Sequence, residues 1–298
     1  MSTDYYSMER KRAFMSKSQL SSWLDCPARE FAIQSGDYKE EVTESLARGQ
    51  LVDAMLTGDS ADVARVENDP KYRDLLFTKK GEPRAVHTRC CEMVARVKRD
   101  ELFMAAINGG KQREIQWTMF GVDWQARLDI CTPPDDRGGI LADLKTTASL
   151  GLRQYCEVRK TYVPYYEAFG YWTQIAVYRE AYRSAFGSYP MLSLIATVTE
   201  QDPPDIDILE FATMADDMSQ IDDSDHRMRI ARELEVIEQV LPLVQSWKSG
   251  SVPAPRCDHP DCAYCRGTKV LERTSRARSV GVVEPKWLTP PTPDYSRD

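Results

Sequence analysis

The spacing of hydrophobic residues predicts a helical N-terminal part of the chain. Within residues 16–34, four apolar side chains fall near one helical face: Leu20, Trp23, Leu24 and Phe31. Ser16 or Ser18 is suited to cap the start of this helix, and Pro27 should break or kink it. Further amphipathic patterns predict three more helices, over residues 44–56, 60–77 and 86–107.

The pattern then changes to that of short strands. Three runs have strand character, over residues 113–120, 122–131 and 139–145, and Gly121 marks a turn between the first two. The rest of the pattern predicts a helix, two strands and an amphipathic helix, over residues 164–186, 191–198, 206–211 and 230–244. Pro242 should kink or shorten that last helix. This order predicts an α/β domain built around a mixed central sheet flanked by helices.

Composition and charge narrow the class of protein. The 298 residues are 42% hydrophobic and 29% charged, which is ordinary for a soluble globular protein. No apolar stretch approaches the ~20 residues that cross a bilayer, and the N-terminus has no apolar core of a signal peptide. A cytoplasmic location without membrane contact is therefore expected. The net charge of −7 argues against binding nucleic acid by bulk positive charge, although a carboxylate metal site would itself add negative charge.

Acidic residues and a lysine gather in the predicted strands. Asp143 and Lys145 are two positions apart, so their side chains share one face of a strand. Asp129 ends the preceding strand, where it could meet Asp143 across the sheet. Carboxylates bind Mg²⁺, the metal lowers the pKa of a bound water, and a lysine can position or deprotonate that water. A D-x-K triplet alone is more often a solvated surface pair, so this interpretation depends on further motifs.

The cysteines form a second candidate site. Cys257, Cys262 and Cys265 follow a C-x4-C-x2-C pattern in a short polar segment, which indicates metal binding and requires a fourth ligand. His259 would complete a tetrahedral zinc site. Cys26 would instead complete a four-thiolate set suited to an iron–sulfur cluster. The residues alone leave both alternatives open.

The stretch REIQWTMFGVDWQARLDICTPPDDRGGILADLKTT resembles the core of the PD-(D/E)xK nucleases. The superfamily pattern of an upstream Glu, an Asp and a final (D/E)-x-K corresponds here to Glu114, Asp129, Asp143 and Lys145. In that superfamily the backbone carbonyl between the last acid and the lysine, here that of Leu144, often completes the metal shell. The resemblance implies a restriction-endonuclease-like core and catalysis with Mg²⁺ or Mn²⁺.

Three further motifs resemble the RecB/RecE-like branch of that superfamily. SKSQLSSWLDCPAREF is similar to its opening helix, and SLARGQLVDAMLTGD to its G-x-x-x-H-x-x-L segment, with Asp53 in place of the metal-binding histidine. An aspartate also offers a hard oxygen ligand for Mg²⁺ or Mn²⁺. YWTQIAVYREAY contains the Q-x-x-x-Y motif as Gln174 and Tyr178, on the same face as Tyr171. In the family this helix lines the site beside the DNA backbone.

The resemblance also concerns the cysteines and the DNA contacts. In iron–sulfur members of the branch, one upstream cysteine joins three near the C-terminal end, which favours a structural [4Fe–4S] cluster on Cys26 and the later triplet. Arg153 and Lys160 flank the segment before the Q-x-x-x-Y helix and are candidate DNA contacts together with Tyr171. Scattered basic residues are, however, more often solvated surface.

We therefore expect a single nuclease domain over residues 1–274, followed by a Pro-rich, disordered tail over residues 275–298. Its expected parts are N-terminal helices, a catalytic core, and a final helix with the cysteine cluster, over residues 16–107, 113–211 and 226–270. By family analogy it is a phage- or prophage-encoded two-metal exonuclease that resects duplex DNA ends 5′-to-3′. The single-stranded tails would serve an annealing protein in recombination or repair.

Alternative interpretations are a CRISPR-adaptation-like or repair nuclease that trims ends, and an inactive DNA-binding module of the same fold. Relatives often form rings around DNA, which makes a homo-oligomer possible, although nothing in the sequence fixes an oligomer.

Overall fold

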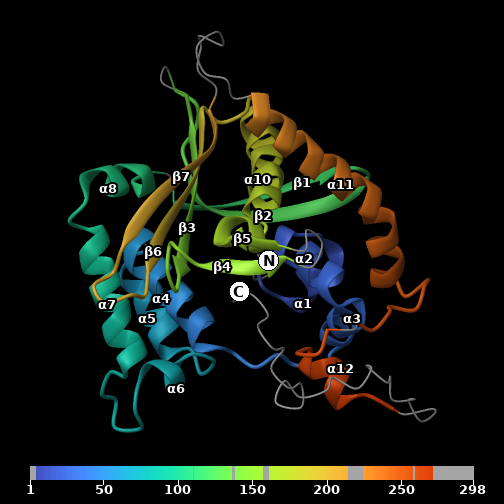
Figure 1. Ribbon diagram of the computed structural model, residues 1–298, viewed down its shortest axis with the longest axis horizontal. Helices are drawn as coiled ribbons and strands as arrows, with labels where there is room; N and C mark the ends of the chain where they lie inside the picture. Colours follow the sequence, from blue (N-terminus) through green and yellow to red (C-terminus); the bar gives the residue numbers. More distant parts are fainter. Residues whose placement is uncertain are drawn as a thin grey trace, which may run out of the picture.

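A mixed five-stranded sheet forms the centre of the fold (Figure 1). The computed structural model describes residues 5–109, 111–135, 138–156, 161–213, 224–257 and 259–270. The strand order is β1-β2-β3-β6-β7, with β1 (Lys111–Met119), β2 (Val122–Cys131), β3 (Ile140–Thr147), β6 (Leu192–Thr199) and β7 (Ile206–Thr213). β3 and β6 are parallel, and the other neighbouring strands are antiparallel. The predicted α/β fold with a mixed sheet is therefore confirmed.

The parallel pair β3–β6 requires a crossover connection. This connection carries a small hairpin and two helices: β4 (Arg153–Cys156), β5 (Thr161–Pro164), α9 (Tyr165–Ala168) and α10 (Tyr171–Phe186). Gly170 separates the two helices with a φ of 66°, a left-handed conformation that favours glycine. The single helix predicted over residues 164–186 is therefore two helices.

Helices cover both faces of the sheet (Figure 1). One face packs against α4 (Glu44–Thr57), α5 (Ser60–Asn68), α6 (Arg73–Leu76), α7 (Ala85–Val97) and α8 (Glu101–Ile107). The other face packs against α2 (Lys17–Asp25), α10 and α11 (Ser224–Lys248). Short helices complete the described chain: α1 (Met8–Ala13), α3 (Pro27–Ser35) and α12 (Ala263–Gly267). None of the helices in these described ranges combines the length and apolar composition needed to span a membrane.

The alternation of side chains along β3 decides which residues face which layer. Ala142 and Leu144 belong to the apolar core beneath α4 and α7, whereas Leu141 belongs to the core beneath α10. Asp143 and Lys145 are two and four positions after Leu141, so their side chains lie on the same face of the strand and point toward α10. This placement brings the D-x-K pair beneath the helix that carries Gln174.

The two prolines that were expected to interrupt helices have different effects. Pro27 separates α2 from α3, as predicted, and occupies the first turn of α3, where its missing N–H costs no helical hydrogen bond. Pro242 lies inside α11 without ending it, because the helix continues to Lys248. Leu241 and Val244 remain fully packed on either side of Pro242, so burial outweighs the local cost of the proline.

The remaining differences concern short elements. The helices predicted over residues 60–77 and 86–107 are each divided, giving α5 with α6 and α7 with α8. The sequence analysis missed three short elements, namely α1, the β4–β5 hairpin and α12. The predicted tail over residues 275–298 lies outside the described residues.

Candidate active site

A cavity of about 300 Å³ opens beside the point where β2 and β3 separate. It contains four of the predicted site residues with charged side chains: Asp53, Asp129, Asp143 and Lys145. Leu144 and Tyr178 also line it. The structure thus brings together residues that are up to 125 positions apart in the sequence, from Asp53 to Tyr178.

The separation of β2 from β3 creates the position of Asp129. The two strands pair only at Ile130 with Ala142 and at Cys131 with Leu141, so the next facing residues would be Asp129 and Asp143. Instead of a strand-to-strand hydrogen bond, the backbone N–H of Leu144 donates to Oδ2 of Asp129 at 3.1 Å. The carboxylate therefore takes the place of the missing ladder contact and is fixed beside Asp143.

Asp143 is the most enclosed acid of the site, with 2% of its surface exposed. Its Oδ1 accepts a hydrogen bond from Nε2 of Gln174 at 2.7 Å. Its Oδ2 lies 2.6 Å from Nζ of Lys145, which is half-buried above the Tyr171 ring at 5.6 Å from the ring centroid. Among the described residues, no group donates a well-directed hydrogen bond to that buried Oδ2. The Lys145 ammonium is the ion-pair partner of this oxygen, so a bound metal ion would share the oxygen with the lysine or displace the lysine.

Asp53 reaches the cavity from α4. Its Oδ1 accepts a hydrogen bond from Oγ1 of Thr57 at 2.8 Å, and its Oδ2 accepts one from Nε2 of Gln112 at 2.9 Å. Gln112 in turn accepts a hydrogen bond from Arg127, which also lines the cavity. These neighbours orient Asp53, the residue that the sequence analysis expects in place of the histidine of the G-x-x-x-H-x-x-L segment.

The electrostatics of the cavity favour a divalent cation. Burial and the nearby Asp143 and Asp53 raise the pKa of Asp129 well above its ordinary value. Burial also raises the pKa of Asp53, against the effect of its hydrogen bond from Thr57. For Lys145, burial lowers the pKa, but Asp143 and Asp129 raise it by more, so this lysine stays protonated. Three carboxylates face two cations in the cavity, Lys145 and Arg127, so the ionised acids leave one negative charge uncompensated. Hard oxygen donors of this kind fit Mg²⁺ or Mn²⁺.

The structure does not bring every predicted residue to this cavity. Glu114 does not line it; its Oε2 accepts a hydrogen bond from Nη1 of Arg10 at 2.9 Å, and it lies in a neighbouring cavity. Arg153 donates to the backbone oxygen of Tyr162 within the β4–β5 hairpin. Tyr171 is buried, and its ring centroid lies 5.6 Å from Nζ of Lys145. Lys160 lies outside the described residues.

The structure adds cavity residues that the sequence analysis missed. Tyr5, Tyr6 and Arg127 line the cavity, as does Ser18 near the start of α2. Arg127 precedes Asp129 by two positions on a predicted strand, so the two side chains share one face of that strand. This spacing could have predicted that Arg127 lies beside the acidic site. Tyr5 and Tyr6 lie in a polar segment without periodicity, and no local pattern indicated their position.

The four predicted cysteines meet at one point, where α12 lies beside α3 (Figure 1). The Sγ atoms of Cys26, Cys257, Cys262 and Cys265 all lie within 4.8 Å of one another. His259 is not in this group, and its Nδ1 accepts a hydrogen bond from the N–H of Asp261. The fourth member of this group is therefore Cys26 and not His259, so the zinc alternative built on the histidine does not fit the structure.

The sulfur spacing carries information about the kind of metal centre. Sγ of Cys265 lies 3.6 Å from Sγ of Cys26 and 3.8 Å from Sγ of Cys257, and Sγ of Cys262 lies 3.9 Å from Sγ of Cys26. Four sulfurs about 2.3 Å from one tetrahedral ion lie about 3.8 Å apart. A cubane cluster bonds each thiolate to a separate iron atom, which places the sulfurs farther apart. These three distances are close to the spacing around a single ion, and four thiols in one place are also the set that an iron–sulfur cluster requires.

One thiol of this cluster is predisposed to bind metal. Burial raises the pKa of Cys262. Hydrogen bonds from the N–H of Cys265 and from the neighbouring thiols outweigh this effect and lower the pKa to about 7. A thiolate is the form that binds metal. Burial and the neighbouring thiols raise the pKa of Cys257 and of Cys265, so Cys262 differs from these two members of the group.

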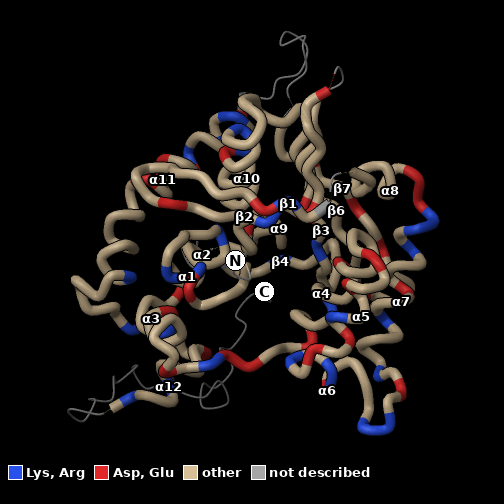
Figure 2. Tube along the Cα trace, turned by 180° about the vertical axis from the view of Figure 1, so that it is seen from behind, with Lys and Arg blue, Asp and Glu red and all other residues tan. Residues whose placement is uncertain are grey.

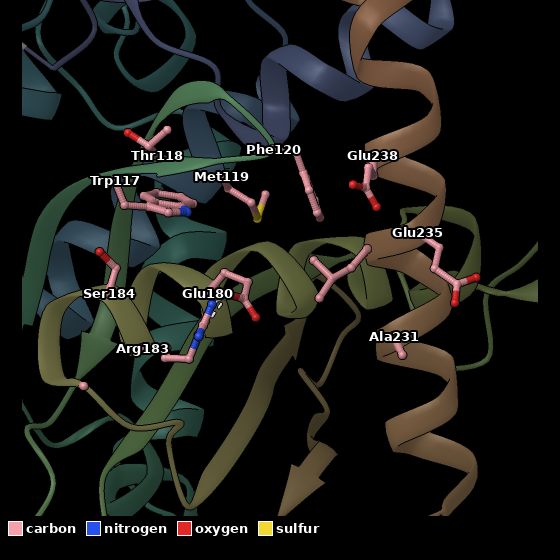
Figure 3. Close-up of a pocket in the computed structure, with 12 residues that line it drawn as sticks. Trp117, Thr118, Met119, Phe120, Glu180, Arg183, Ser184, Ala231, Glu235 and Glu238 are labelled. Atoms are coloured by element: carbon pink, nitrogen blue, oxygen red, sulfur yellow. Dashed lines mark hydrogen bonds and ion pairs between the residues drawn. The ribbon is translucent and has the colours of Figure 1, made fainter.

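A separate cavity of about 790 Å³ lies between the β1–β2 turn, α10 and α11 (Figure 3). Figure 3 shows Glu235 and Glu238 on α11, opposite Glu180 and Arg183 on α10. Glu180 is held by Arg183 and by the hydroxyl of Tyr189. This cavity lacks the grouped aspartates and the lysine of the candidate active site.

Charged positions are interspersed along the chain (Figure 2). Both signs occur on the helices and strands of the described chain, and acidic residues outnumber basic residues in the full sequence by 46 to 39.

The fold and the carboxylate–lysine site define a protein of the PDDEXK-like class. Residues 16–268 match the family described as a PDDEXK-like domain of unknown function (DUF3799). Since this match covers most of the chain, the protein belongs to that family. No curated protein matches the chain.

Two solved structures are similar to the chain. A crystal structure from Eubacterium rectale, described as a "putative exonuclease", has a TM-score of 0.77 and 26% sequence identity. That similarity covers 93% of this chain and 96% of the other. A structure described as SSO0001 covers 80% of this chain with a TM-score of 0.28 and 12% identity, which is too low to carry an argument.

Proposed function

We propose that the protein is a metal-dependent deoxyribonuclease that hydrolyses phosphodiester bonds in the cavity of Asp129, Asp143 and Lys145. The observation that supports this most directly is the fixed position of the two aspartates beside the lysine, where β2 and β3 separate. Two carboxylates and a lysine in one cavity are the groups that metal-assisted hydrolysis of a phosphodiester requires.

Each residue has a defined task in this proposal. Asp129 and Asp143 would bind Mg²⁺ or Mn²⁺, with Asp53 as a third carboxylate and the carbonyl of Leu144 as a further oxygen. The bound metal would stabilise charge on the scissile phosphate and supply a water of lowered pKa. Lys145 is protonated and orients that water or the phosphate. Gln174 holds the side chain of Asp143 in its orientation through a hydrogen bond. Tyr178 lines the cavity, where it would lie beside the DNA backbone.

We further infer that the enzyme acts as an exonuclease on linear duplex ends. The structure from Eubacterium rectale, described as a "putative exonuclease", supports this because its fold matches nearly the full length of both chains. Resection in the 5′-to-3′ direction by a two-metal mechanism follows from the resemblance to RecB/RecE-like enzymes. The single-stranded tails would then serve an annealing protein during recombination or repair, in a phage or its bacterial host.

The experiment is digestion of linear duplex DNA with Mg²⁺ or Mn²⁺, labelled separately at the 5′ and 3′ ends. A closed circular duplex serves as the substrate without ends. Asp143→Asn and Lys145→Ala should each lower the rate by about 10²- to 10⁴-fold while the fold is retained. Cutting of the circle would contradict the requirement for an end. Tight DNA binding without any hydrolysis would instead favour an inactive DNA-binding module.

We also infer that the four thiolates bind one tetrahedral metal ion, for which Zn²⁺ is the suited ion. The sulfur spacing supports this assignment, and the [4Fe–4S] cluster implied by the resemblance is the alternative. Either centre would tie the junction of α2 and α3 to α12 and so stabilise two distant ends of the domain.

A further inference from the structure

Tyr5 and Tyr6 lie where three cavities meet. Both rings line the candidate active-site cavity and a neighbouring cavity of about 250 Å³. Tyr6 also lines a third cavity, of about 660 Å³. The two ring centroids are 5.0 Å apart and the rings are nearly perpendicular, at 87°. Tyr6 therefore belongs to the walls of all three cavities, and Tyr5 to the walls of two of them.

Arginine side chains hold the two rings in place. Cζ of Arg127 lies 5.6 Å from the Tyr6 ring centroid, and its Nη1 donates to the Tyr6 hydroxyl at 3.4 Å. Cζ of Arg10 lies 5.2 Å from the Tyr5 ring centroid. Arg10 is itself buried and donates to Gln125 at 2.9 Å. Tyr6 nevertheless remains 49% exposed. A positioned but exposed aromatic ring is what base stacking requires.

The Tyr6 ring is also connected to the acidic site. Arg127, which contacts Tyr6, donates to Gln112, and Gln112 donates to Asp53. The ring and the candidate metal ligand are therefore positioned by one chain of polar contacts. A nucleotide whose phosphate lies at Lys145 would have its base within the same group of cavities.

Charge gives a reason for the protein to use stacking. The net charge of −7 and the three carboxylates of the cavity weaken binding of a phosphate backbone by attraction alone. Stacking on an aromatic ring is independent of charge and accepts every base, because each base has a π-face. Stacking needs an unpaired base, since bases within a duplex cover one another's faces.

We propose that Tyr6, supported by Tyr5, stacks on an unpaired nucleobase next to the scissile phosphate and so selects a frayed or single-stranded DNA end. This inference rests on the proposed nuclease function and adds the class of substrate that the site accepts.

The test compares substrates with and without the base. A duplex with a short single-stranded end is prepared in two forms, one intact and one abasic in the last nucleotides of that end. Binding to the full chain is measured by fluorescence anisotropy in Ca²⁺, which occupies oxygen sites, and hydrolysis is measured separately in Mg²⁺. The variants are Tyr6→Leu and Tyr6→Phe. The control is Phe120→Leu, since Phe120 is 38% exposed but lines none of the three cavities.

Tyr6→Leu should weaken binding of the intact end by roughly 5- to 150-fold, the range for loss of one stacked base. Tyr6→Phe and Phe120→Leu should bind within about twofold of the wild type, because a ring remains beside the site. The wild type and Tyr6→Leu should bind the abasic DNA end with equal affinity. Thermal melting of each variant shows that the fold is retained.

Two results would overturn the inference. An equal loss on intact and abasic ends would show that Tyr6 acts on something other than the base. Tighter binding or faster hydrolysis by Tyr6→Leu would show that the rings obstruct the cavity. Failure of the proposed nuclease function has a different signature, namely no Mg²⁺-dependent hydrolysis of either substrate by the wild type, while the binding comparison can still be made.

Discussion

Nε2 of Gln174 on α10 donates a hydrogen bond to Oδ1 of Asp143 on β3 at 2.7 Å. Both side chains are buried, with 4% and 2% of their surfaces exposed. The bond orients the carboxylate so that its other oxygen faces Lys145 and the cavity. Gln174 therefore acts as a positioning residue in the proposed site.

Gln174→Met keeps the volume of the side chain but removes the donor. We expect a 10- to 100-fold loss in activity or in metal affinity, the usual effect of removing a partner of a metal ligand. The concentration of Mg²⁺ for half-maximal hydrolysis should rise. Gln116→Met on the exposed face of β1 is the matched control and should have no effect. An unchanged Mg²⁺ requirement in Gln174→Met would contradict the assigned role.

Glu114 provides a test of the upstream acid in the superfamily pattern. Because Glu114 pairs with Arg10 and does not line the carboxylate cavity, we expect Glu114→Gln to keep activity within about threefold of the wild type. Asp143→Asn, measured in parallel, should lose at least about 10²-fold. A comparable loss of activity in both variants would show that Glu114 takes part in catalysis.

The sequence predicted most of this site because the relevant spacings are local. Asp143 and Lys145 are two positions apart on one strand, and Gln174 and Tyr178 are one turn apart on one helix. The periodicity of a strand or a helix is enough to place the two residues of each pair on the same face. The strand over residues 122–131 has the predicted bounds, which follows from its regular alternation and the turn at Gly121.

What the sequence could not show depends on contacts between distant segments. Arg10 pairs with Glu114 across 104 positions, and this pair diverts the glutamate from the site. The separation of β2 from β3, which places Asp129, is a property of the whole sheet. Tyr5 and Tyr6 lie just before α1, whose buried Arg10 donates a hydrogen bond to Gln125 across 115 positions. No periodicity in the first 13 residues predicts that contact.

The raised pKa of Asp129 predicts a dependence of stability on pH. Burial, with the nearby Asp143 and Asp53, makes the folded state bind a proton more tightly than the unfolded state does. This contribution to the stability of the metal-free protein is fully present below the ordinary carboxyl pKa of about 4. It should fall as pH rises from there toward the raised pKa of the folded state.

Thermal melting without added divalent ions, between about pH 5 and pH 8, measures this slope. Asp129→Asn should reduce it, because the amide does not titrate. Added Mg²⁺ should raise the Tm, and by more at higher pH, since the ion binds the carboxylate and competes with the proton. The same slope in wild type and Asp129→Asn would show that other groups cause the dependence.

The four-thiol cluster predicts a specific metal content. Because the Sγ atoms are spaced as around one tetrahedral ion, we expect about one zinc per chain and no visible charge-transfer absorption in protein purified without oxygen. Four iron atoms per chain and a brown colour would instead establish the iron–sulfur alternative.

Removal of one thiol should show what the metal centre stabilises. Cys265→Ser removes the central sulfur of the cluster, which lies within 3.8 Å of both Cys26 and Cys257. We expect loss of the bound metal and a lower Tm, because the link between Cys26 and α12 is then broken. Cys91→Ser is the control, since Cys91 is exposed and outside the cluster. Retention of full metal content and Tm in Cys265→Ser would show that the thiols are packed together without binding a metal.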